Sequence, residues 1–287
     1  MTTLSPELEE HRRALVGLGY RMLGSLADAE DVAQEALLRL HQAADPPGRP
    51  RAWLVRVATR LCLDRLRELR RRREAYVGEW LPDLLVAEDP SEEVALADAL
   101  SVALLVVLES LSPAERAAFI LHDVFGYGYD ELAAALDRGE PACRQLVSRA
   151  RRRLDERRAR FEPDAGRRAA VAHAFMQAAS EGEMAPLVAL LTDDVVLRAD
   201  SAGRRPAPRR ALHGPEQVSR FLLGVGRKGG RHATFSLLTV NGTPGFLATI
   251  DGEPDSIYGF DVADGRIAAI HVVREPDKVR AALARLP

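Results

Sequence analysis

The stretch that most constrains the fold is EPACRQLVSRARRRL, residues 140–154, because as a helix it would have two very different faces. At about 100° per residue, an apolar set of side chains falls on one side. These are Cys143, Leu146, Val147, Ala150 and Leu154. The opposite side carries groups that can hydrogen-bond base edges or phosphates. They are Arg144, Gln145, Ser148, Arg149 and Arg152. Alone, this pattern leaves open both contact with DNA and a solvated surface helix.

The residues before this stretch favour contact with DNA. Ser112-Pro113-Ala114-Glu115 has the form of a capping box with proline at the first helical position, so it predicts a helix that stops at 125–128. A second short helix is expected over 129–136, and the tight turn 137–139 joins it to the arginine-rich helix. Two helices joined by a glycine-containing turn, with the basic face on the second, form the helix-turn-helix pattern. An ordinary three-helix bundle gives no reason for that placement of charge, so we predict that 140–154 enters the major groove.

Composition limits the other possibilities. Net charge is only −2 over 287 residues, so affinity for DNA has to come from local basic patches. A chain of this length is expected to hold about two domains. Cys62 and Cys143 fall among apolar helical positions without metal-ligand spacing, so we expect buried free thiols in a reducing compartment, no metal and no cofactor. The sequence shows no signal peptide and no apolar run long enough to span a bilayer, which predicts a cytoplasmic protein without a membrane partner.

Residues from about 4 to 73 are predicted to be helical, over 8–23, 27–42 and 51–73. The second helix has an apolar stripe and, opposite it, an acidic face with one leucine in it. The residues of this face are Asp28, Asp31, Gln34, Glu35 and Leu38. The third helix is strongly basic, and Trp53 lies on its apolar stripe, where we expect it in the core.

Along the rest of the chain, the predicted secondary structure changes twice. Residues 74–91 read as an acidic linker that contains Trp80-Leu81-Pro82, and helices resume over 92–161. Beyond 163 we expect a helix over 167–181 and a helical turn over 185–191, while 203–210 reads as a flexible loop. Strands are expected over 195–198, 233–240, 246–251, 256–262 and 266–274, before a last helix over 276–286. Helices followed by a curved, mostly antiparallel sheet indicate a separate α+β domain.

Three blocks of this sequence resemble a known family. GSLADAEDVAQEALLRL (24–40), RAWLVRVATRLCLDRLR (51–67) and the segment 111–154 resemble regions 2 and 4 of extracytoplasmic-function sigma factors. The C-terminal part resembles a SnoaL-like domain, and the whole is similar to the SigJ-like group, which carries that domain in place of a separate anti-sigma protein. Three short signatures of the group have counterparts at 80–84, 200–204 and 275–279, of which the second matches only loosely.

The resemblance implies a multidomain chain: two all-α domains, the second with the helix-turn-helix, followed by an α+β cone domain. Region 2 would be 1–73, the linker 74–91, region 4 92–162 and the SnoaL-like regulatory domain 163–287. Such a protein binds core RNA polymerase and directs initiation at alternative promoters, so its partners would be the polymerase and promoter DNA.

The resemblance also assigns roles to residues. The outer face of 140–154 would read the −35 element, and the acidic face of the second helix would grip the polymerase, unless that face is merely solvated. Contacts to the −10 element would come from Arg51, Arg56, Arg60 and Arg67. Regulatory contacts, by which the C-terminal domain would dock on the linker and the helical domains, would involve Trp80, Pro82, Asp200, Pro276, Asp277 and Lys278.

The alternative is a helix-turn-helix regulator fused to a ligand-binding or enzymatic domain. His271 shares a strand face with Ala269 and Val273, while Tyr258 and Phe260 line one face of the neighbouring strand. Such a face in a cone fold is either a pocket with a general base or a packed core with one hydrogen-bonded histidine. No pair of titratable groups stands out at catalytic spacing in the sequence, so we expect no enzyme activity.

Overall fold

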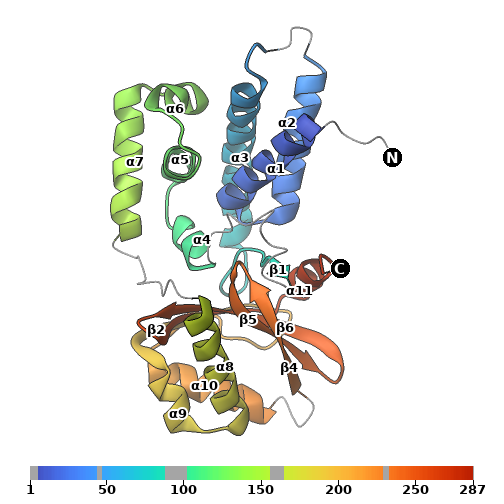
Figure 1. The fold of residues 1–287 in the computed structure, drawn as a ribbon, viewed down its shortest axis with the longest axis vertical. Helices are drawn as coiled ribbons and strands as arrows, with labels where there is room; N and C mark the ends of the chain where they lie inside the picture. Colours follow the sequence, from blue (N-terminus) through green and yellow to red (C-terminus); the bar gives the residue numbers. More distant parts are fainter. Residues whose placement is uncertain (1–5, 44–46, 88–101, 156–164, 229–232, 287) are drawn as a thin grey trace. The chain divides into compact units, whose positions relative to one another are not determined.

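The computed structural model describes residues 6–43, 47–87, 102–155, 165–228 and 233–286 (Figure 1). The chain divides into two compact units. Unit 1 comprises residues 1–75 and 105–158, and unit 2 comprises residues 76–104 and 159–287. The sequence predictions for 92–101 and 156–161 lie outside the described residues.

The first part of unit 1 is a bundle of long helices. They are α1 (Pro6–Leu23), α2 (Leu26–His41) and α3 (Pro50–Glu74). Gly24, at φ 68°, ends α1, and Ser25 caps α2 by accepting a hydrogen bond from the Asp28 amide at 3.4 Å. Gly19 lets the two helices approach closely, since a Cβ there would lie 2.9 Å from the Ala29 Cα. The three helices predicted for this region are therefore confirmed.

The second part of unit 1 contains the helix-turn-helix. Its elements are the part of α4 (Val102–Leu108) from residue 105 on, α5 (Pro113–Phe119), the π-helical turn η2 (Ile120–Val124), α6 (Tyr129–Leu136) and α7 (Glu140–Asp155). The capping box is present, with Ser112 accepting from the Glu115 amide and the Glu115 carboxylate accepting from the Ser112 amide. Asp137 ends α6 in the left-handed conformation, at φ 54°, and so turns the chain into α7. The predicted helix-turn-helix is confirmed.

Unit 2 holds a curved seven-stranded sheet in the order β1-β4-β5-β6-β7-β2-β3. The strands are β1 (Val86–Ala87), β2 (Leu191–Asp200), β3 (Leu212–His213), β4 (Ala233–Val240), β5 (Thr243–Ile250), β6 (Glu253–Ala263) and β7 (Arg266–Val273). Only β2 and β7 pair in parallel; the other neighbours are antiparallel. Two-residue turns join β4 to β7 in succession, each with Asn or Asp followed by Gly at positive φ: 241–242, 251–252 and 264–265. Such turns match the twist of the strands they connect.

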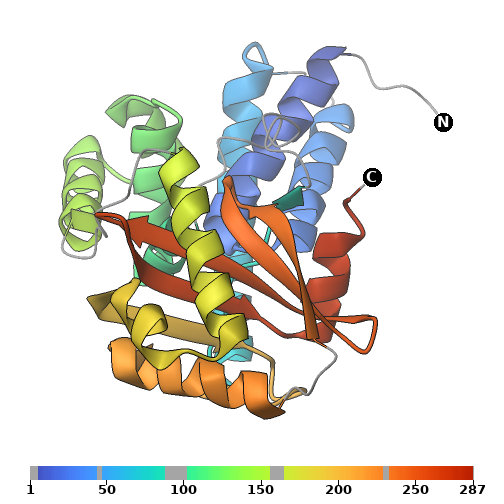
Figure 2. The same ribbon diagram turned by 60° about the horizontal axis from the view of Figure 1, so that its bottom comes forward.

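Helices cover one face of this sheet (Figure 2). They are α8 (Ala165–Glu181), α9 (Met184–Ala189) and α10 (Pro215–Lys228), while α11 (Pro276–Leu283) follows β7. The core between helices and sheet contains Phe175, Phe246 and Phe260, packed edge to face with ring centres 5.4 and 5.8 Å apart. The predicted α+β architecture is confirmed, but three elements were missed: β1 inside the linker, β3, and α10.

The pocket interpretation of the C-terminal strands was wrong. Gly259 pairs with His271, and Phe260 with Ile270, so His271 lies on the sheet face opposite to Tyr258 and Phe260. Phe260 points into the filled core, whereas His271 hydrogen-bonds Asp261 at 2.6 Å with both residues 3% exposed. The structure thus fits a packed core with one hydrogen-bonded histidine. It also contains a buried pair of titratable groups that the sequence did not reveal.

Candidate nucleic-acid interface and linker site

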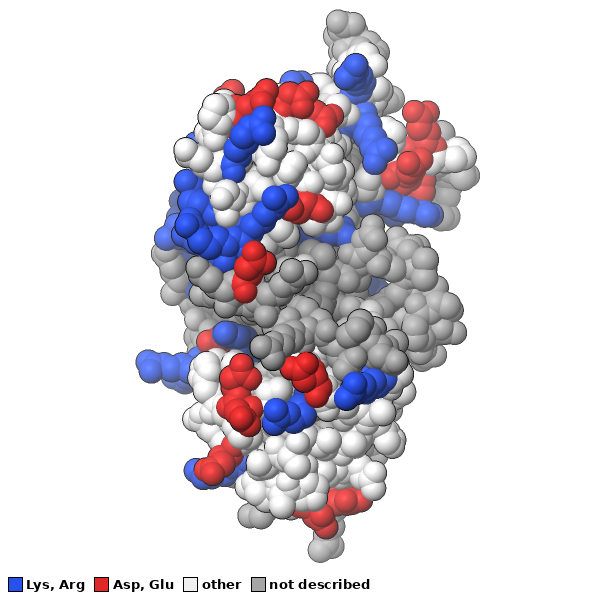
Figure 3. Space-filling view, turned by 60° about the vertical axis from the view of Figure 1, so that its left-hand side comes forward, with Lys and Arg blue, Asp and Glu red and all other residues white. Residues whose placement is uncertain are grey.

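Helix α7 has the two faces expected of it. Its apolar side chains are buried against α5 and α6, with Cys143 and Ala150 fully enclosed. All five residues proposed to touch DNA are exposed: Arg144, Gln145, Ser148, Arg149 and Arg152. Viewed from the α7 side, Lys and Arg side chains gather on the surface of unit 1, with carboxylates beside them (Figure 3). The local basic patch needed for DNA affinity is therefore present despite the low net charge.

Neighbouring residues hold two of these arginines in place. Arg144 lies over the Tyr129 ring at 4.2 Å and pairs with Glu140 at 3.2 Å. The Nε of Arg149 donates to Glu115 at 3.1 Å, and Arg153 pairs with the other oxygen of the same carboxylate at 2.8 Å. Burial by itself raises the pKa of Glu115, but the hydrogen bonds from Ser112 and these arginines outweigh it and leave the pKa below its ordinary value. The capping carboxylate of α5 thus orients arginines of α7.

A groove of about 420 Å³ runs along α7 beside α6. It is lined by Tyr129, Arg144, Val147, Ser148, Arg151, Arg152 and Asp155. The sequence reasoning omitted Arg151, which pairs with Asp123 at 2.6 Å and lies seven residues after Arg144 on the same side. This spacing of two helical turns places Arg151 on the same side of the helix as Arg144, so it could have been identified from the sequence.

On the acidic face of α2, Asp31, Gln34 and Leu38 are exposed, whereas Asp28 and Glu35 are half-buried and paired. Arg65 on α3 donates to Asp28 at 2.8 Å and to Asp31 at 3.3 Å, and Glu35 pairs with Arg39 at 2.7 Å. Leu38, at 46% exposure, is one of the most exposed large apolar residues in the described part of the chain. An exposed leucine among carboxylates offers a partner both an apolar contact and opposite charge.

The basic helix α3 presents Arg51, Arg60 and Arg67 to solvent, whereas Arg56 is half-buried. Trp53 is half-buried too, and with Arg56 and Tyr127 it lines a cavity of about 280 Å³ between α3 and α6. The expectation that Trp53 lies in the core therefore needs correction, since this residue is half-buried and borders the cavity.

Two arginines, one buried and one half-buried, join the two parts of unit 1. Arg116, 3% exposed, donates to the Met22 carbonyl at 2.7 Å and to Glu109 at 2.8 Å. Arg73 donates to the Leu23 carbonyl at 3.0 Å and pairs with Glu109 as well. These contacts satisfy the last carbonyls of α1, which have no partner within the helix.

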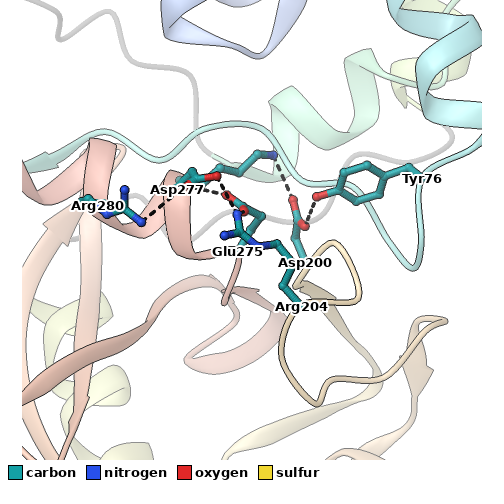
Figure 4. Close-up of polar contacts among 7 residues, drawn as sticks. Tyr76, Asp200, Arg204, Glu275, Asp277 and Arg280 are labelled. Atoms are coloured by element: carbon teal, nitrogen blue, oxygen red, sulfur yellow. Dashed lines mark hydrogen bonds and ion pairs between the residues drawn. The ribbon is translucent and has the colours of Figure 1, made fainter.

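In unit 2, the linker is held by a cluster centred on Asp200 (Figure 4). This carboxylate is fully buried and accepts hydrogen bonds from the Tyr76 hydroxyl, the Leu81 amide at 3.0 Å and the Lys278 ammonium at 2.9 Å. Lys278 also donates to the Leu81 carbonyl and lies 4.4 Å from the centre of the Trp80 ring. Burial, and then the hydrogen bond to Asp200, raise the pKa of the Tyr76 phenol, so it remains a neutral donor.

Further hydrogen bonds extend this linker cluster. Arg204 donates to Glu275 at 2.7 Å and to Asp277 at 2.6 Å, while Glu275 caps α11 by accepting from the Lys278 amide. The side-chain oxygen of Asn241 accepts from the Leu85 amide at 3.1 Å, and the backbone N–H of Asn241 donates to the Leu85 carbonyl at 2.8 Å. Both bonds lie next to the β1–β4 pairing. The backbone of the linker is therefore bonded at both ends of the segment 81–87.

The residues singled out in the sequence differ in what they do here. Lys278 contacts both Asp200 and Trp80, Pro82 is buried, and Pro276 occupies the first turn of α11. Asp277 is exposed and holds Arg204. Arg204 and Glu275 lie in the segments 200–204 and 275–279 that the sequence had marked, whereas Tyr76 and Asn241 were missed because their partners lie 124 and 156 residues away along the chain.

None of the helices within the described ranges is long and apolar enough to cross a membrane. Among these same residues, no group of three or more His, Cys, Asp or Glu side chains is arranged to hold a metal ion.

Comparisons with known proteins cover nearly the whole chain. Residues 8–72 match the model of sigma-70 region 2, and residues 101–154 match that of sigma-70, region 4. ECF RNA polymerase sigma factor SigJ of Mycobacterium tuberculosis is 39% identical over 287 residues, which covers 95% of this chain and 92% of that protein. Probable ECF RNA polymerase sigma factor SigI of the same organism is 35% identical over 95% of this chain and 94% of its own length. The crystal structure of M. tuberculosis SigJ superimposes with a TM-score of 0.80 at 35% identity, covering 96% of this chain and 98% of that one.

Proposed function

Because this chain belongs to the extracytoplasmic-function family of RNA polymerase sigma factors, we propose that its helix-turn-helix reads the −35 promoter element through the outer face of α7. Sigma factors bind core RNA polymerase and promoter DNA, and this chain is an alternative sigma factor with a C-terminal SnoaL-like domain. What carries the assignment to α7 is its exposed row of arginine, glutamine and serine. Arg149 is bonded to Glu115 through Nε, so its terminal nitrogens remain for a base.

Two variants of α7 test this reading. Arg149→Ala should weaken binding to the promoter by about 1–3 kcal/mol if Arg149 reads a guanine, and should relax specificity at that base pair. Arg152→Ala should weaken binding to all sequences alike and lower the salt slope by about one unit, as expected of a phosphate contact. Fluorescence anisotropy on promoter and scrambled duplexes at several salt concentrations distinguishes them. Equal losses on every sequence for both variants would mean that the reading face is rotated.

We propose that the exposed face of α2 binds core polymerase and that the arginines of α3 contact the −10 element. Leu38 and the carboxylates of Asp31 and Glu35 support the first part, because they combine an apolar anchor with negative charge. Asp31→Arg together with Glu35→Arg should abolish capture of core polymerase while DNA binding by α7 persists. Full polymerase affinity in a pull-down would show that this face is only solvated.

We propose further that the C-terminal domain regulates the factor in cis through the linker. The linker joins the two promoter-reading regions, which have to meet their elements at a fixed spacing, so a domain that holds the linker biases their arrangement. The supporting observation is the buried Asp200, which takes three hydrogen bonds from the linker and Lys278. The core filled by Phe175, Phe246 and Phe260 favours this role over an enzymatic one.

Truncation tests the regulatory role. A chain ending after residue 161 loses the whole domain, whereas one ending near residue 274 keeps the sheet but loses α11 and Lys278. In vitro transcription with core polymerase should change for the first chain and rise for the second, because the second loses the contacts of Lys278 with Asp200 and with the Leu81 carbonyl. Identical output from both truncations and the full chain would refute regulation in cis.

A further inference from the structure

We propose that a hollow between the linker and the loop after β2 binds a small organic anion. This arginine pocket has a volume of about 370 Å³ and is lined by the linker turn Val77–Gly78, by Ser201 and by residues 203–209, all within unit 2. Binding in the pocket goes beyond the proposed function, whereas its effect on transcription rests on it.

The walls of the arginine pocket are preformed. Ala202 and Gly203, at φ 50° and 70°, form a tight turn closed by the Arg204 amide donating to the Ser201 carbonyl at 2.8 Å. This turn packs on the linker, since a Cβ at Gly203 would lie 2.9 Å from Val77 Cγ1. The loop beyond it contains two prolines and is tied to the sheet, because Arg274 donates to the Pro206 carbonyl. A hollow with fixed walls loses little entropy on binding.

The charge of the lining is entirely positive. Arg204, Arg205 and Arg209 line the pocket, and no Asp or Glu does. Carboxylates outside the lining orient the first two: Glu275 and Asp277 hold Arg204, and Asp255 holds Arg205. Arg209 is exposed and makes no hydrogen bond or ion pair among the described residues. One guanidinium therefore remains uncompensated, and it suits a carboxylate or phosphate, which it can bind with two parallel hydrogen bonds.

The other part of the lining is apolar. Val77 is 45% exposed, and Pro206, Ala207 and Pro208 face the same hollow. An inorganic ion would leave these surfaces in water, whereas a ligand with a short apolar body would cover them. The volume is at the lower end of the range for ligand pockets, about 300–1,000 Å³. The chemical class that fits is a small carboxylate or phosphate monoester with an apolar group.

The position of the pocket couples binding to the linker. Val77 follows Tyr76, and Arg204 belongs to the linker cluster. A ligand that touches both walls binds only while the linker lies on the C-terminal domain, so by linkage it strengthens that state. The pocket would make the built-in regulator responsive to the concentration of such an anion.

Calorimetry on the full chain tests binding without polymerase. Phenyl phosphate and benzoate are the probes, inorganic phosphate supplies charge alone, and benzyl alcohol supplies the apolar group alone. We expect the two probes to bind with a Kd of about 1 mM or tighter. Arg209→Ala should lower the affinity for both probes at least about tenfold, since it removes a charge-assisted contact. Arg210→Ala is the matched control, because Arg210 is exposed beside Arg209 but does not line the pocket, and it should leave the affinity within about twofold.

Val77→Ser separates the apolar contribution. The substitution should weaken the binding of phenyl phosphate and leave the calorimetric signal with inorganic phosphate unchanged. Equal affinities of the parent and Arg209→Ala for both probes, or no heat from either probe up to about 10 mM, would overturn the pocket. The thermal unfolding midpoint of each variant, unchanged from the parent, shows that a loss of binding is not a loss of fold. If the probes bind as expected but do not change the output of in vitro transcription, only the proposed coupling of the pocket to regulation is overturned.

Discussion

Replacing Asp200 by alanine is expected to release the linker from the C-terminal domain. The substitution deletes the acceptor of three hydrogen bonds at a fully buried position. Tyr76 and Lys278 are both partly exposed and can turn to water, but the Leu81 amide belongs to a residue with no exposed surface.

The size of the effect follows from these contacts. An unsatisfied buried amide costs about 1–3 kcal/mol. Breaking a largely buried ion pair costs about 3–5 kcal/mol, and the side chain of Lys278 is 15% exposed. Lys278 keeps the Leu81 carbonyl and the Trp80 ring, which reduces the second cost. We therefore expect the linker-bound state to lose about 3 kcal/mol, a large fraction of the stability of a typical domain, about 5–15 kcal/mol.

Hydrogen exchange read by mass spectrometry measures this loss directly. A change of about 3 kcal/mol corresponds to amides of 76–87 exchanging about a hundredfold faster. Asp277→Ala is the control, because Asp277 is exposed, pairs only with half-exposed or exposed arginines, and should cost less than about 1 kcal/mol. Unchanged exchange over 76–87 in Asp200→Ala would refute the idea that this carboxylate holds the linker.

Other variants probe unit 1. Gly19→Ala should destabilise it by about 1–3 kcal/mol in urea unfolding, because the new methyl group meets the Ala29 backbone, whereas Gly17→Ala meets only the end of the Arg21 side chain and should stay within about 1 kcal/mol of the parent. Arg116→Met should cost about 2 kcal/mol in the same assay, because it leaves the Met22 carbonyl without this buried donor and removes one of the two arginines that pair with Glu109; a loss below about 1 kcal/mol would contradict that role. Because the folded pKa of Glu115 is lowered, its contribution to stability is complete above the ordinary Glu range and is lost as the pH falls through the lowered pKa. Glu115→Gln should remove that part of the pH dependence in thermal unfolding scans, and identical pH profiles would contradict it.

Local signals made unit 1 predictable from sequence. The capping box at Ser112, the glycine at 24 and the apolar stripe of α7 each act within a few residues, so they are visible without knowing the fold. The same holds for the exposed faces of α2 and α7, since the buried stripe fixes what lies opposite. The pairing of these charged side chains was not predictable, because Arg65 and Glu115 meet their partners across helices.

The elements of unit 2 were harder to predict from sequence, because several of them form through contacts between residues far apart in the chain. β1 is two residues long and exists through its pairing with β4, about 150 residues later in the chain. α10 contains Gly224 and Gly226, which weaken the helical pattern, and it forms against β2 and α9. The face of His271 was misjudged because alternation within a strand does not say which neighbour faces it; the register of β6 on β7 does.

The order in which these contacts appear matters while the chain is being made. The three Asn/Asp-Gly turns let β4 to β7 pair with their neighbours as soon as they emerge, but Leu85 waits for Asn241, 156 residues later, and Leu81 waits for Lys278, 197 residues later. At about 5–20 residues per second, the ribosome needs several seconds to go from α7 to α11. During that interval the regions that match sigma-70 regions 2 and 4 are already complete, while the residues that hold the linker between them are still being added. If the C-terminal domain regulates the factor in cis as proposed, each new molecule is unregulated for a short time. A core polymerase that binds the molecule during this time binds a factor whose regulatory domain has not yet been completely synthesised.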